Sequence, residues 1–345
     1  MSIRELENIK PLDEEAMSEA EKRWLSVVKT LFSLGRLEET ITQIAGIKGK
    51  SDFTLDKKAL VIMCADNGVV SEGISQCGSE VTATVAKSFL EKKSTVCIMA
   101  ERANVDILPI DAGMASDVND IPKIKVSYGT KNIATGAAMS REECVTIIKR
   151  SIELVGKLKK DGYDLLLTGE MGIGNTSSSS LWMTCFTGIP LDQCVGAGSG
   201  LNHQGINHKY EVLKRSLEQY PGEHSAEEIL CRFGGYEMVM AVGAMLKAAE
   251  LGMVILIDGF IMTNCILAAS RLYPEVMSYA IFGHQGDESG HKLLLDYLGA
   301  RPLLNLGLRL GEGSGSVCAY PIVDSAVKML NEMDSFAHAS ITKYF

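Results

Sequence analysis

The chain has 345 residues, of which 46% are apolar, and it carries a net charge of −9. This length suffices for one large α/β domain or two smaller ones. The acidic balance argues against non-specific binding to nucleic acid or to an anionic membrane surface.

No segment of the sequence reads as a membrane or export signal. The N-terminal stretch MSIRELENIK lacks the apolar core of a signal peptide. The most apolar stretch, residues 253–269, is interrupted by Asp258 and Gly259, and it therefore favours a buried strand followed by a helix over a membrane span. We expect a cytoplasmic protein with neither a membrane nor a nucleic-acid partner.

Cysteine and histidine spacing indicates no metal site. The nine cysteines form no CxxC pair, and the six histidines form no HExxH motif. His203 and His208 are five residues apart, which is a poor spacing for two ligands on one helix face. We expect reduced cysteines in the core and no bound metal.

The N-terminal region predicts an amphipathic helix over residues 13–35. Apolar residues recur there every three or four positions, and Asp13 is a candidate N-cap. A second amphipathic pattern covers residues 315–336, near the C-terminus.

Between these helices, short apolar runs alternate with helical segments. The runs lie in residues 59–70, 105–114, 163–175, 253–260 and 278–290, and each ends in a small or polar turn. Capping boxes at Ser140–Glu143 and Ser225–Glu228 mark two helix starts. Continuous apolar strands that alternate with helices predict a doubly wound parallel α/β sheet, whose ligands bind at the carboxyl ends of the strands.

The first candidate site is the stretch GEMGIGNTSSSS, which follows a buried strand. Gly172 and Gly174 permit a close backbone approach, and Asn175, Thr176 and Ser177 would begin a helix. The N-terminus of a helix favours an anion such as phosphate. An ordinary tight turn before a helix remains the alternative, since neither GxGxxG nor a Walker loop is present.

Three further polar residues follow glycine-rich turns or a strand end. Lys209 closes the stretch GAGSGLNHQGINHK and is either a phosphate ligand or a solvated surface lysine. Asp258 follows four apolar residues and is either a ribose ligand or a helix cap. Glu312, between Gly311 and Gly313, is either a general base or a solvated turn residue.

Seven motifs occur in one order along the chain: ADNGVVSEGIS…EVT, GEMGIGNTSSS, GAGSGLNHQGINHK, FGGYEMVMAVGAML, ILIDGFIMT, GHQGDESGH and RLGEGSGS. In this register they resemble the nicotinate-nucleotide–dimethylbenzimidazole phosphoribosyltransferase family, which activates the lower ligand of cobalamin. The resemblance extends from about residue 13 to residue 336. It implies a Rossmann-like α/β domain over residues 57–314 and a small helical domain built from residues 1–56 and 315–345.

The resemblance also implies a reaction and a set of site residues. The reaction moves 5-phosphoribose from nicotinate mononucleotide to an aromatic base, without a metal or cofactor, in a dimer whose partner subunit helps to line the site. Glu312 would be the base, and Glu170 would lie near the transferred ribose. Donor contacts would come from Gly172, Gly174, Asn175, Thr176, Ser177, Lys209, Asp258 and Gly259. Acceptor contacts would come from Ser75, Cys77, Ser79, Glu80, Met171 and Leu310.

Two departures from the family pattern leave the acceptor open. The family usually has Tyr-Pro-Gln before the EVT motif, where this chain has Cys77, Gly78 and Ser79, and Gly286 stands where a serine is usual. The alternatives are the same reaction with a phenol or purine acceptor, as a homodimer or with a paralogous chain, and a silent paralogue that supports an active partner.

Overall fold

A computed structural model describes residues 8–345, and its centre is one parallel sheet of five strands. The strands lie in the order β2-β1-β3-β4-β5 and all neighbours run parallel. Their bounds are β1 Lys58–Ala65, β2 Asp106–Gly113, β3 Leu165–Met171, β4 Val254–Ile257 and β5 Ala280–Phe282. The predicted doubly wound α/β sheet is therefore confirmed, and each predicted strand region contains one strand.

The sheet register brings the polar strand ends together. Cys64 near the end of β1 is paired with Asp111 on β2 and with Met171 on β3. The chain leaves β1 toward β2 on one side and returns to β3 on the other, so the strand order reverses between β1 and β3. Such a switch point opens a crevice at the carboxyl edge of a parallel sheet.

The helices connect these strands and pack on the sheet. Their bounds are α1 Glu14–Ser26, α2 Arg36–Lys48, α3 Glu80–Leu90, α4 Thr95–Ala103, α5 Arg141–Lys160, α6 Asn175–Thr187, α7 Leu191–Cys194, α8 His203–Glu218, α9 Ala226–Phe233, α10 Tyr236–Glu250, α11 Phe260–Leu272, α12 His291–Leu298 and α13 Ser314–Glu332. Two 3₁₀ helices, η1 Gly68–Glu72 and η2 Pro274–Tyr279, complete the set.

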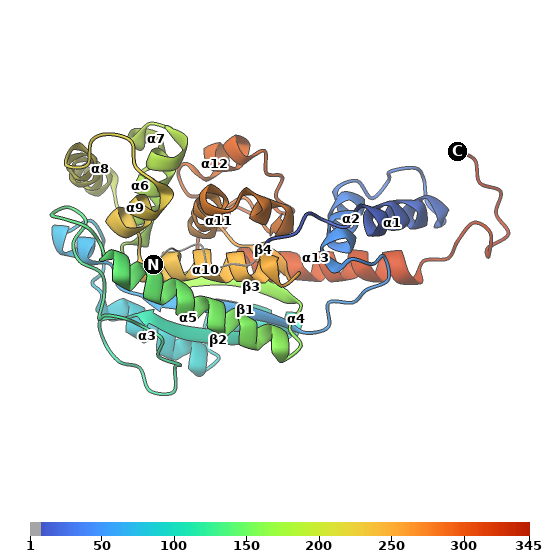
Figure 1. Cartoon of the computed structure of the whole chain (residues 1–345), viewed down its shortest axis with the longest axis horizontal. Helices are drawn as coiled ribbons and strands as arrows, with labels where there is room; N and C mark the ends of the chain where they lie inside the picture. The colour runs from blue at the N-terminus through green and yellow to red at the C-terminus, as the bar shows by residue number, and fades with distance from the viewer. Residues whose placement is uncertain (1–7) are drawn as a thin grey trace.

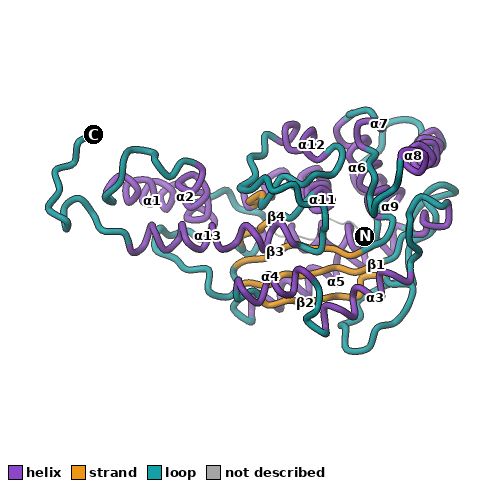
Figure 2. The backbone as a smooth tube through the Cα atoms, turned by 180° about the vertical axis from the view of Figure 1, so that it is seen from behind, coloured by secondary structure: helices purple, strands orange, loops and turns teal. Residues whose placement is uncertain are grey.

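Helices cover both faces of the sheet. Helix α10 packs on β1 to β4 with α5 outside it, and this layer faces the viewer in Figure 1. Helices α3, α4 and α13 lie on the opposite face, as the view from behind in Figure 2 shows. Because both faces are covered, all eight residues of β1 are buried, which explains the unbroken apolar run from Ala59 to Ala65.

The predicted helix starts are confirmed. Ser140 and Ser225 each begin a helix with both reciprocal hydrogen bonds of a capping box, to Glu143 and Glu228. Asp13 accepts the backbone N–H of Ala16 and so caps α1 as predicted.

The prediction of one helix over residues 13–35 was wrong. Helix α1 ends at Ser26, because Val27 is extended and forms an antiparallel bridge with Ser335. Phe32 then adopts a left-handed conformation and is 69% exposed, so the apolar spacing there marks no buried face. A second helix, α2, begins at Arg36 and was not predicted.

Helix α13 joins the candidate site to the terminal helices. It begins at Ser314 beside the sheet, packs on β3 and β4, and then extends to α1 and α2 (Figure 1). Since one helix packs on both the sheet and the terminal helices, the division of the chain into two domains stays a prediction.

Candidate active site

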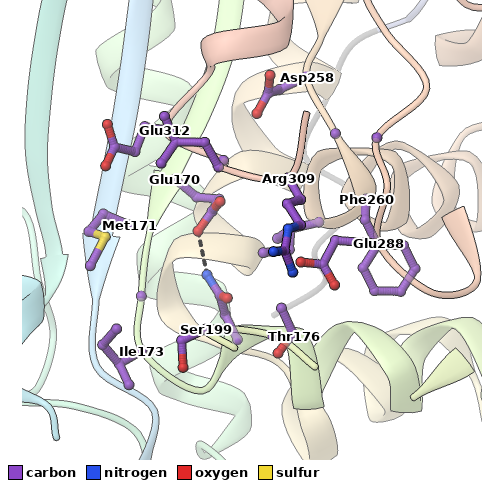
Figure 3. A pocket seen from close by; sticks show the side chains of 18 of the residues that line it. Glu170, Met171, Ile173, Thr176, Ser199, Asp258, Phe260, Glu288, Arg309 and Glu312 are labelled. Atoms are coloured by element: carbon purple, nitrogen blue, oxygen red, sulfur yellow. Dashed lines mark hydrogen bonds between the residues drawn. The ribbon is translucent and has the colours of Figure 1, made fainter. Parts of the chain in front are cut away.

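A pocket opens at the carboxyl ends of β3, β4 and β5 (Figure 3). Its walls come from the loop before α6, the loop after β4, and the segment before α13. Twelve residues predicted from the sequence line it: Ser75, Glu170, Met171, Gly172, Gly174, Asn175, Thr176, Lys209, Asp258, Gly259, Leu310 and Glu312. The structure thus brings together residues that are up to 237 positions apart in the sequence, from Ser75 to Glu312.

Four predicted site residues do not line this pocket. Ser177 is fully buried in α6, and its hydroxyl has no hydrogen-bond partner among residues 8–345. Cys77, Ser79 and Glu80 lie before and at the start of α3, outside the pocket lining. The acceptor contacts predicted for these three residues are therefore not part of the pocket formed by this one chain.

The glycine-rich loop leads directly into α6, as predicted. Gly174 has a φ of +92° and is the N-cap residue, and Asn175 is the first residue of the helix. The N–H groups of Asn175 and Ser177 donate to the carbonyls of Gly172 and Gly174 at 3.2 and 3.0 Å, so it is the dipole of α6 that favours an anion in the pocket.

Lys209 adds a positive charge beside this helix start. Its ammonium lies 2.8 Å from the Thr176 hydroxyl, and the side chain is 1% exposed. Burial lowers the pKa of Lys209 to about 8. Glu288 lines the same pocket and interacts with Lys209 electrostatically, and a phosphate would supply a further counter-charge, which a solvated surface lysine would not need.

Glu170, at the end of β3, is held by the first residue of α6. The side-chain amide of Asn175 donates a hydrogen bond to Glu170 Oε2 (dashed in Figure 3). Burial, together with the nearby Glu237, Asp258 and Glu312, raises the pKa of Glu170 to about 8. A carboxyl group in this setting favours a cationic partner, because ionisation without one is costly.

Gly172 is required by packing against the protein itself. A Cβ atom there would lie 2.7 Å from the Ala65 carbonyl oxygen and 2.7 Å from Glu237 Oε1. The sequence suggested that this glycine makes room for a ligand. In the structure, the position that its Cβ atom would occupy faces the protein interior.

Asp258 organises the turn that carries Glu312. Its carboxylate accepts backbone N–H groups from Gly313 at 3.2 Å, Gly315 at 2.7 Å and Ser316 at 3.0 Å. Both oxygens thus accept hydrogen bonds from the start of α13. The sequence alternative was a cap on the helix that directly follows Asp258, which is α11. The ribose contact of Asp258 stays a prediction.

Glu312 occupies a strained backbone position. Its φ is +61°, between Gly311 at +79° and Gly313 at +85°. A left-handed conformation is unfavourable for a residue with a Cβ atom and often marks a functional site. Burial raises the pKa of Glu312 to about 7, and Asp258 contributes to the shift. A carboxyl group with such a pKa suits general-base catalysis near neutral pH.

The structure adds charged residues that the sequence analysis did not identify. Arg309 and Glu288 both line the pocket, with their charged groups near one another in Figure 3. His284 is buried in the wall, and its Nε2 lies 3.8 Å from Asp258 Oδ1. All three belong to the motifs GHQGDESGH and RLGEGSGS. The motifs therefore indicated this region of the site, but no pattern of spacing within them identified these three residues.

Two absences hold for the described part of the chain. Residues 8–345 contain no group of three or more His, Cys, Asp or Glu side chains that could hold a metal ion. None of the helices within those residues has the length and apolar character needed to cross a membrane.

Comparisons with known proteins agree with this geometry. The family model described as Phosphoribosyltransferase (DBI_PRT) matches residues 9–341. The nicotinate-nucleotide–dimethylbenzimidazole phosphoribosyltransferase of Bacteroides fragilis is 54% identical over 323 residues, covering 93% of this chain and 94% of the relative. The protein of the same name from Parabacteroides distasonis is 52% identical, with 93% and 94% covered.

A solved structure has the same fold. The crystal structure of CobT from Thermus thermophilus superposes with a TM-score of 0.91 at 32% identity. The match covers 96% of this chain and 100% of that one.

Proposed function

Because the chain belongs to the nicotinate-nucleotide–dimethylbenzimidazole phosphoribosyltransferase family, we propose that it transfers 5-phosphoribose from nicotinate mononucleotide to dimethylbenzimidazole or a related aromatic base. The products are nicotinate and an α-ribotide, which is the activated lower ligand in cobamide biosynthesis. The observation that carries the proposal is the pocket itself, where Glu312 and Glu170 share one cavity with Lys209 and the first turn of α6.

The donor binds with its phosphate at the N-terminus of α6. Lys209 and the Thr176 hydroxyl are already in contact there, and the positive end of the helix dipole completes an anion site. This position leaves the ribose and its C1′ atom toward Glu170 and Glu312.

The reaction breaks the bond between C1′ and the nicotinate ring nitrogen and forms a bond between C1′ and a nitrogen of the acceptor. The electron pair of the broken bond returns to the pyridinium nitrogen, so nicotinate leaves with a neutral ring. The acceptor loses its N–H proton to the Glu312 carboxylate. Such general-base catalysis contributes typically about 10²–10⁴-fold.

Positive charge develops on the ribose in the transition state, and acidic residues near it stabilise that charge. Glu170 is the nearest candidate, because it lines the pocket from the end of β3. The bound donor, with its pyridinium ring, also favours the ionised form of this carboxyl group. Glu170 and Glu312 thereby have separate roles, one electrostatic and one as base.

The acceptor binds against the apolar part of the lining, which includes Val85, Met171, Ile173 and Leu310. Leu310 is 49% exposed in the single chain. We infer that a partner subunit covers this side in a homodimer, and that the enzyme works in the cytoplasm.

The test is a product analysis with the purified chain, nicotinate mononucleotide and equal amounts of dimethylbenzimidazole, adenine and p-cresol. We expect the benzimidazole ribotide to predominate and Glu312→Gln to slow its formation by about 10²-fold or more. A predominant phenol or purine ribotide would replace the proposed acceptor. No product from any acceptor, with nicotinate mononucleotide still bound, would contradict the proposed activity of the chain alone.

A further inference from the structure

Behind the pocket, a buried acid is paired with a buried amide. Glu237, in the first turn of α10, has no exposed surface, and Asn67 follows β1. Asn67 Nδ2 donates to Glu237 Oε1 at 3.0 Å. The other two oxygens, Glu237 Oε2 and Asn67 Oδ1, have no hydrogen-bond partner among residues 8–345.

These two oxygens both lie close to Gly235. A Cβ atom on Gly235 would lie 2.5 Å from Glu237 Oε2 and 2.7 Å from Asn67 Oδ1. Two buried acceptors without a donor are unfavourable, because each has lost its hydrogen bonds to water. A single proton on Glu237 Oε2 satisfies both, because it can be donated to Asn67 Oδ1. Acid and amide then form a closed ring of two hydrogen bonds.

The surroundings of Glu237 favour the neutral acid. Burial raises the pKa of Glu237 to about 7, and the carboxylate of Asp66 acts in the same direction. The other titratable groups that interact with it are Cys64 on β1, Cys265 on α11 and Glu170 on β3. None of these is a cation.

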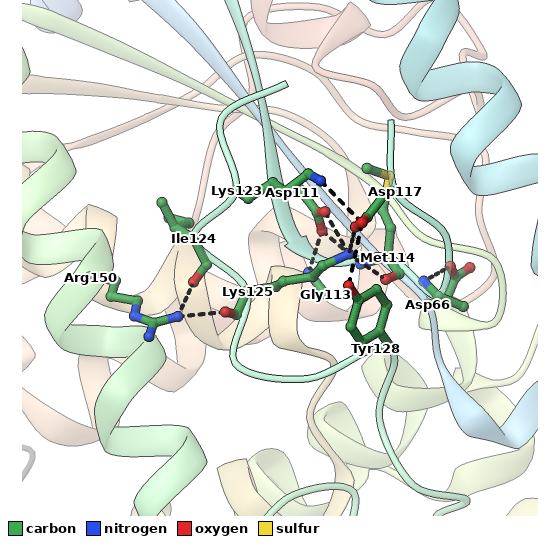
Figure 4. Close-up of polar contacts among 11 residues, drawn as sticks. Asp66, Asp111, Gly113, Met114, Asp117, Lys123, Ile124, Lys125, Tyr128 and Arg150 are labelled. Atoms are coloured by element: carbon green, nitrogen blue, oxygen red, sulfur yellow. Dashed lines mark hydrogen bonds and ion pairs between the residues drawn. The ribbon is translucent and has the colours of Figure 1, made fainter. Parts of the chain in front are cut away.

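Lys125, which interacts electrostatically with Asp66, is already paired. Its ammonium lies 2.8 Å from Asp111 on β2 and also contacts Asp117 (Figure 4). Asp66 itself accepts the backbone N–H of Ala115 at 2.7 Å. This cluster therefore offers no counter-charge for an ionised Glu237.

The acid–amide pair connects to the active site through Asn175. The Asn175 side-chain amide donates to Glu170, and it also lies close enough to the Glu237 carboxyl group to lower the pKa of that group. One amide nitrogen has two hydrogens, so it can serve both carboxyl groups. A Cβ atom on Gly172 would lie 2.7 Å from Glu237 Oε1 and 3.1 Å from Asn175 Nδ2, which explains the glycine at the contact.

We propose that Glu237 is a positioning residue for the transferase reaction: as a neutral acid paired with Asn67, it orients the Asn175 amide so that this amide donates to Glu170. The proposal rests on the proposed function, in which Glu170 stabilises the cationic ribose. Without Glu237, nothing in this contact stops the Asn175 side chain from turning its oxygen toward Glu170. The donor on Glu170 Oε2 would then be lost, and ionisation of Glu170 would need a higher pH.

The test compares four variants with the wild type: Glu237→Gln, Glu237→Met, Asn67→Asp, and the double variant Asn67→Asp/Glu237→Gln. A glutamine reproduces the neutral acid, with an N–H in place of the O–H and a carbonyl oxygen for Asn67 and Asn175. The double variant exchanges acid and amide and keeps the ring. Methionine fills the space without polar atoms, and Asn67→Asp places two acids side by side.

We expect Glu237→Gln and the double variant to keep kcat within about threefold of the wild type, since the hydrogen-bond pattern is unchanged. Glu237→Met and Asn67→Asp should lower kcat by roughly 10- to 100-fold, as for other displaced catalytic groups. In Glu237→Met, the acidic limb of the pH profile of kcat/KM should move to higher pH, which a change in packing alone would not cause. Should Glu237→Met or Asn67→Asp fail to fold, a loss of kcat of more than about tenfold in Glu237→Gln or in the double variant would still overturn the proposal.

Equal losses in Glu237→Gln and Glu237→Met would overturn the proposal, because they would show that the charge of Glu237 matters. So would a double variant no more active than Asn67→Asp. A second readout does not depend on transferase activity. At about pH 6, below the pKa of this group, the infrared spectrum of the wild type should contain a protonated-carboxyl band that Glu237→Gln lacks. If that band is present in a chain that forms no ribotide, the proposed function fails while the neutral acid stands, and if it is absent the acid–amide pair is refuted.

Discussion

The Asp258 carboxylate accepts the backbone N–H of Gly315 at 2.7 Å and so connects the end of β4 to the first turn of α13. Glu312 lies three residues before Gly315, in the left-handed turn that these hydrogen bonds fix. The position of the proposed base therefore depends on a residue whose side chain is 2% exposed and already fully engaged.

Asp258→Asn tests this dependence. Asparagine places an NH₂ group where one carboxylate oxygen now accepts a backbone N–H, so the turn must shift. We expect kcat to fall roughly 10- to 100-fold, while the affinity for nicotinate mononucleotide, measured by calorimetry, changes little. Asp287→Asn, at an exposed acid nearby outside the pocket lining, is the matched control. If the affinity falls as much as kcat, Asp258 contacts the ribose instead.

The strain at Glu312 predicts opposite effects on stability and activity. A left-handed conformation costs a residue with a Cβ atom about 1–3 kcal/mol, and glycine avoids this strain. The larger backbone entropy of glycine in the unfolded chain offsets about 0.5–1 kcal/mol of the gain. Glu312→Gly should therefore melt at a higher temperature than Glu312→Gln, although both lose about 10²-fold or more in transfer rate. Comparing these two variants at one pH removes the effect of the lost charge. A lower melting temperature for Glu312→Gly would show that the turn is not strained.

Lys209 predicts a pH dependence of donor binding. The pKa of Lys209 is lowered to about 8, so the side chain is charged below that pH and becomes neutral above it. The affinity for nicotinate mononucleotide should fall as the pH rises through about 8. Lys209→Ala should remove this dependence and weaken the nucleotide by roughly 1.5–3 kcal/mol.

Nicotinate riboside, which lacks the phosphate, is the comparison ligand, and Lys214→Ala, at an exposed lysine of the same helix, is the control variant. Calorimetry that finds equal losses for nucleotide and riboside in Lys209→Ala would place the phosphate elsewhere.

Glu170 predicts how the stability of the ligand-free protein varies with pH. Its pKa rises from 4.5 in the unfolded chain to about 8 in the fold, so the folded state binds the proton more tightly. The contribution of this group to folding is most favourable below pH 4.5, declines as the pH rises, and reaches its minimum above about pH 8. Glu170→Gln removes this penalty. The unfolding free energy of Glu170→Gln relative to wild type, from urea titrations, should increase between pH 5 and pH 8, and a difference that is constant with pH would contradict the raised pKa.

The sequence predicted those features that depend on neighbours along the chain. Each strand of the sheet is short, apolar and followed by a glycine or polar turn, so strand and loop were recognisable together. The start of α6 at Asn175 followed from the glycine-rich turn before it. The boundary of α1 did not, because Val27 is held by Ser335, which is over 300 positions away.

Residues that act through long-range contacts were the ones missed. Glu237 is a lone acid at the start of a helix that is otherwise almost wholly apolar, and this was a usable signal within the motif FGGYEMVMAVGAML. Its partner Asn67 is 170 positions away, so the pairing was invisible in the sequence. Asp258 was recognised as a strand-end acid, but its three backbone donors belong to a loop and helix 55 to 58 positions later.

Helix α13 makes the active site sensitive to events at the far end of the molecule. Its 19 residues, with Pro321 in the interior, span about 28 Å at 1.5 Å per residue, with the Glu312 turn at one end and the packing against α1 and α2 near the other. A tilt of the helix by about 5° about its distal end displaces the Glu312 turn by about 2 Å. This displacement is larger than the geometry of a reactive complex tolerates. A substitution that loosens the packing of α1 or α2 on α13 is therefore expected to lower the catalytic rate, although neither terminal helix lines the pocket.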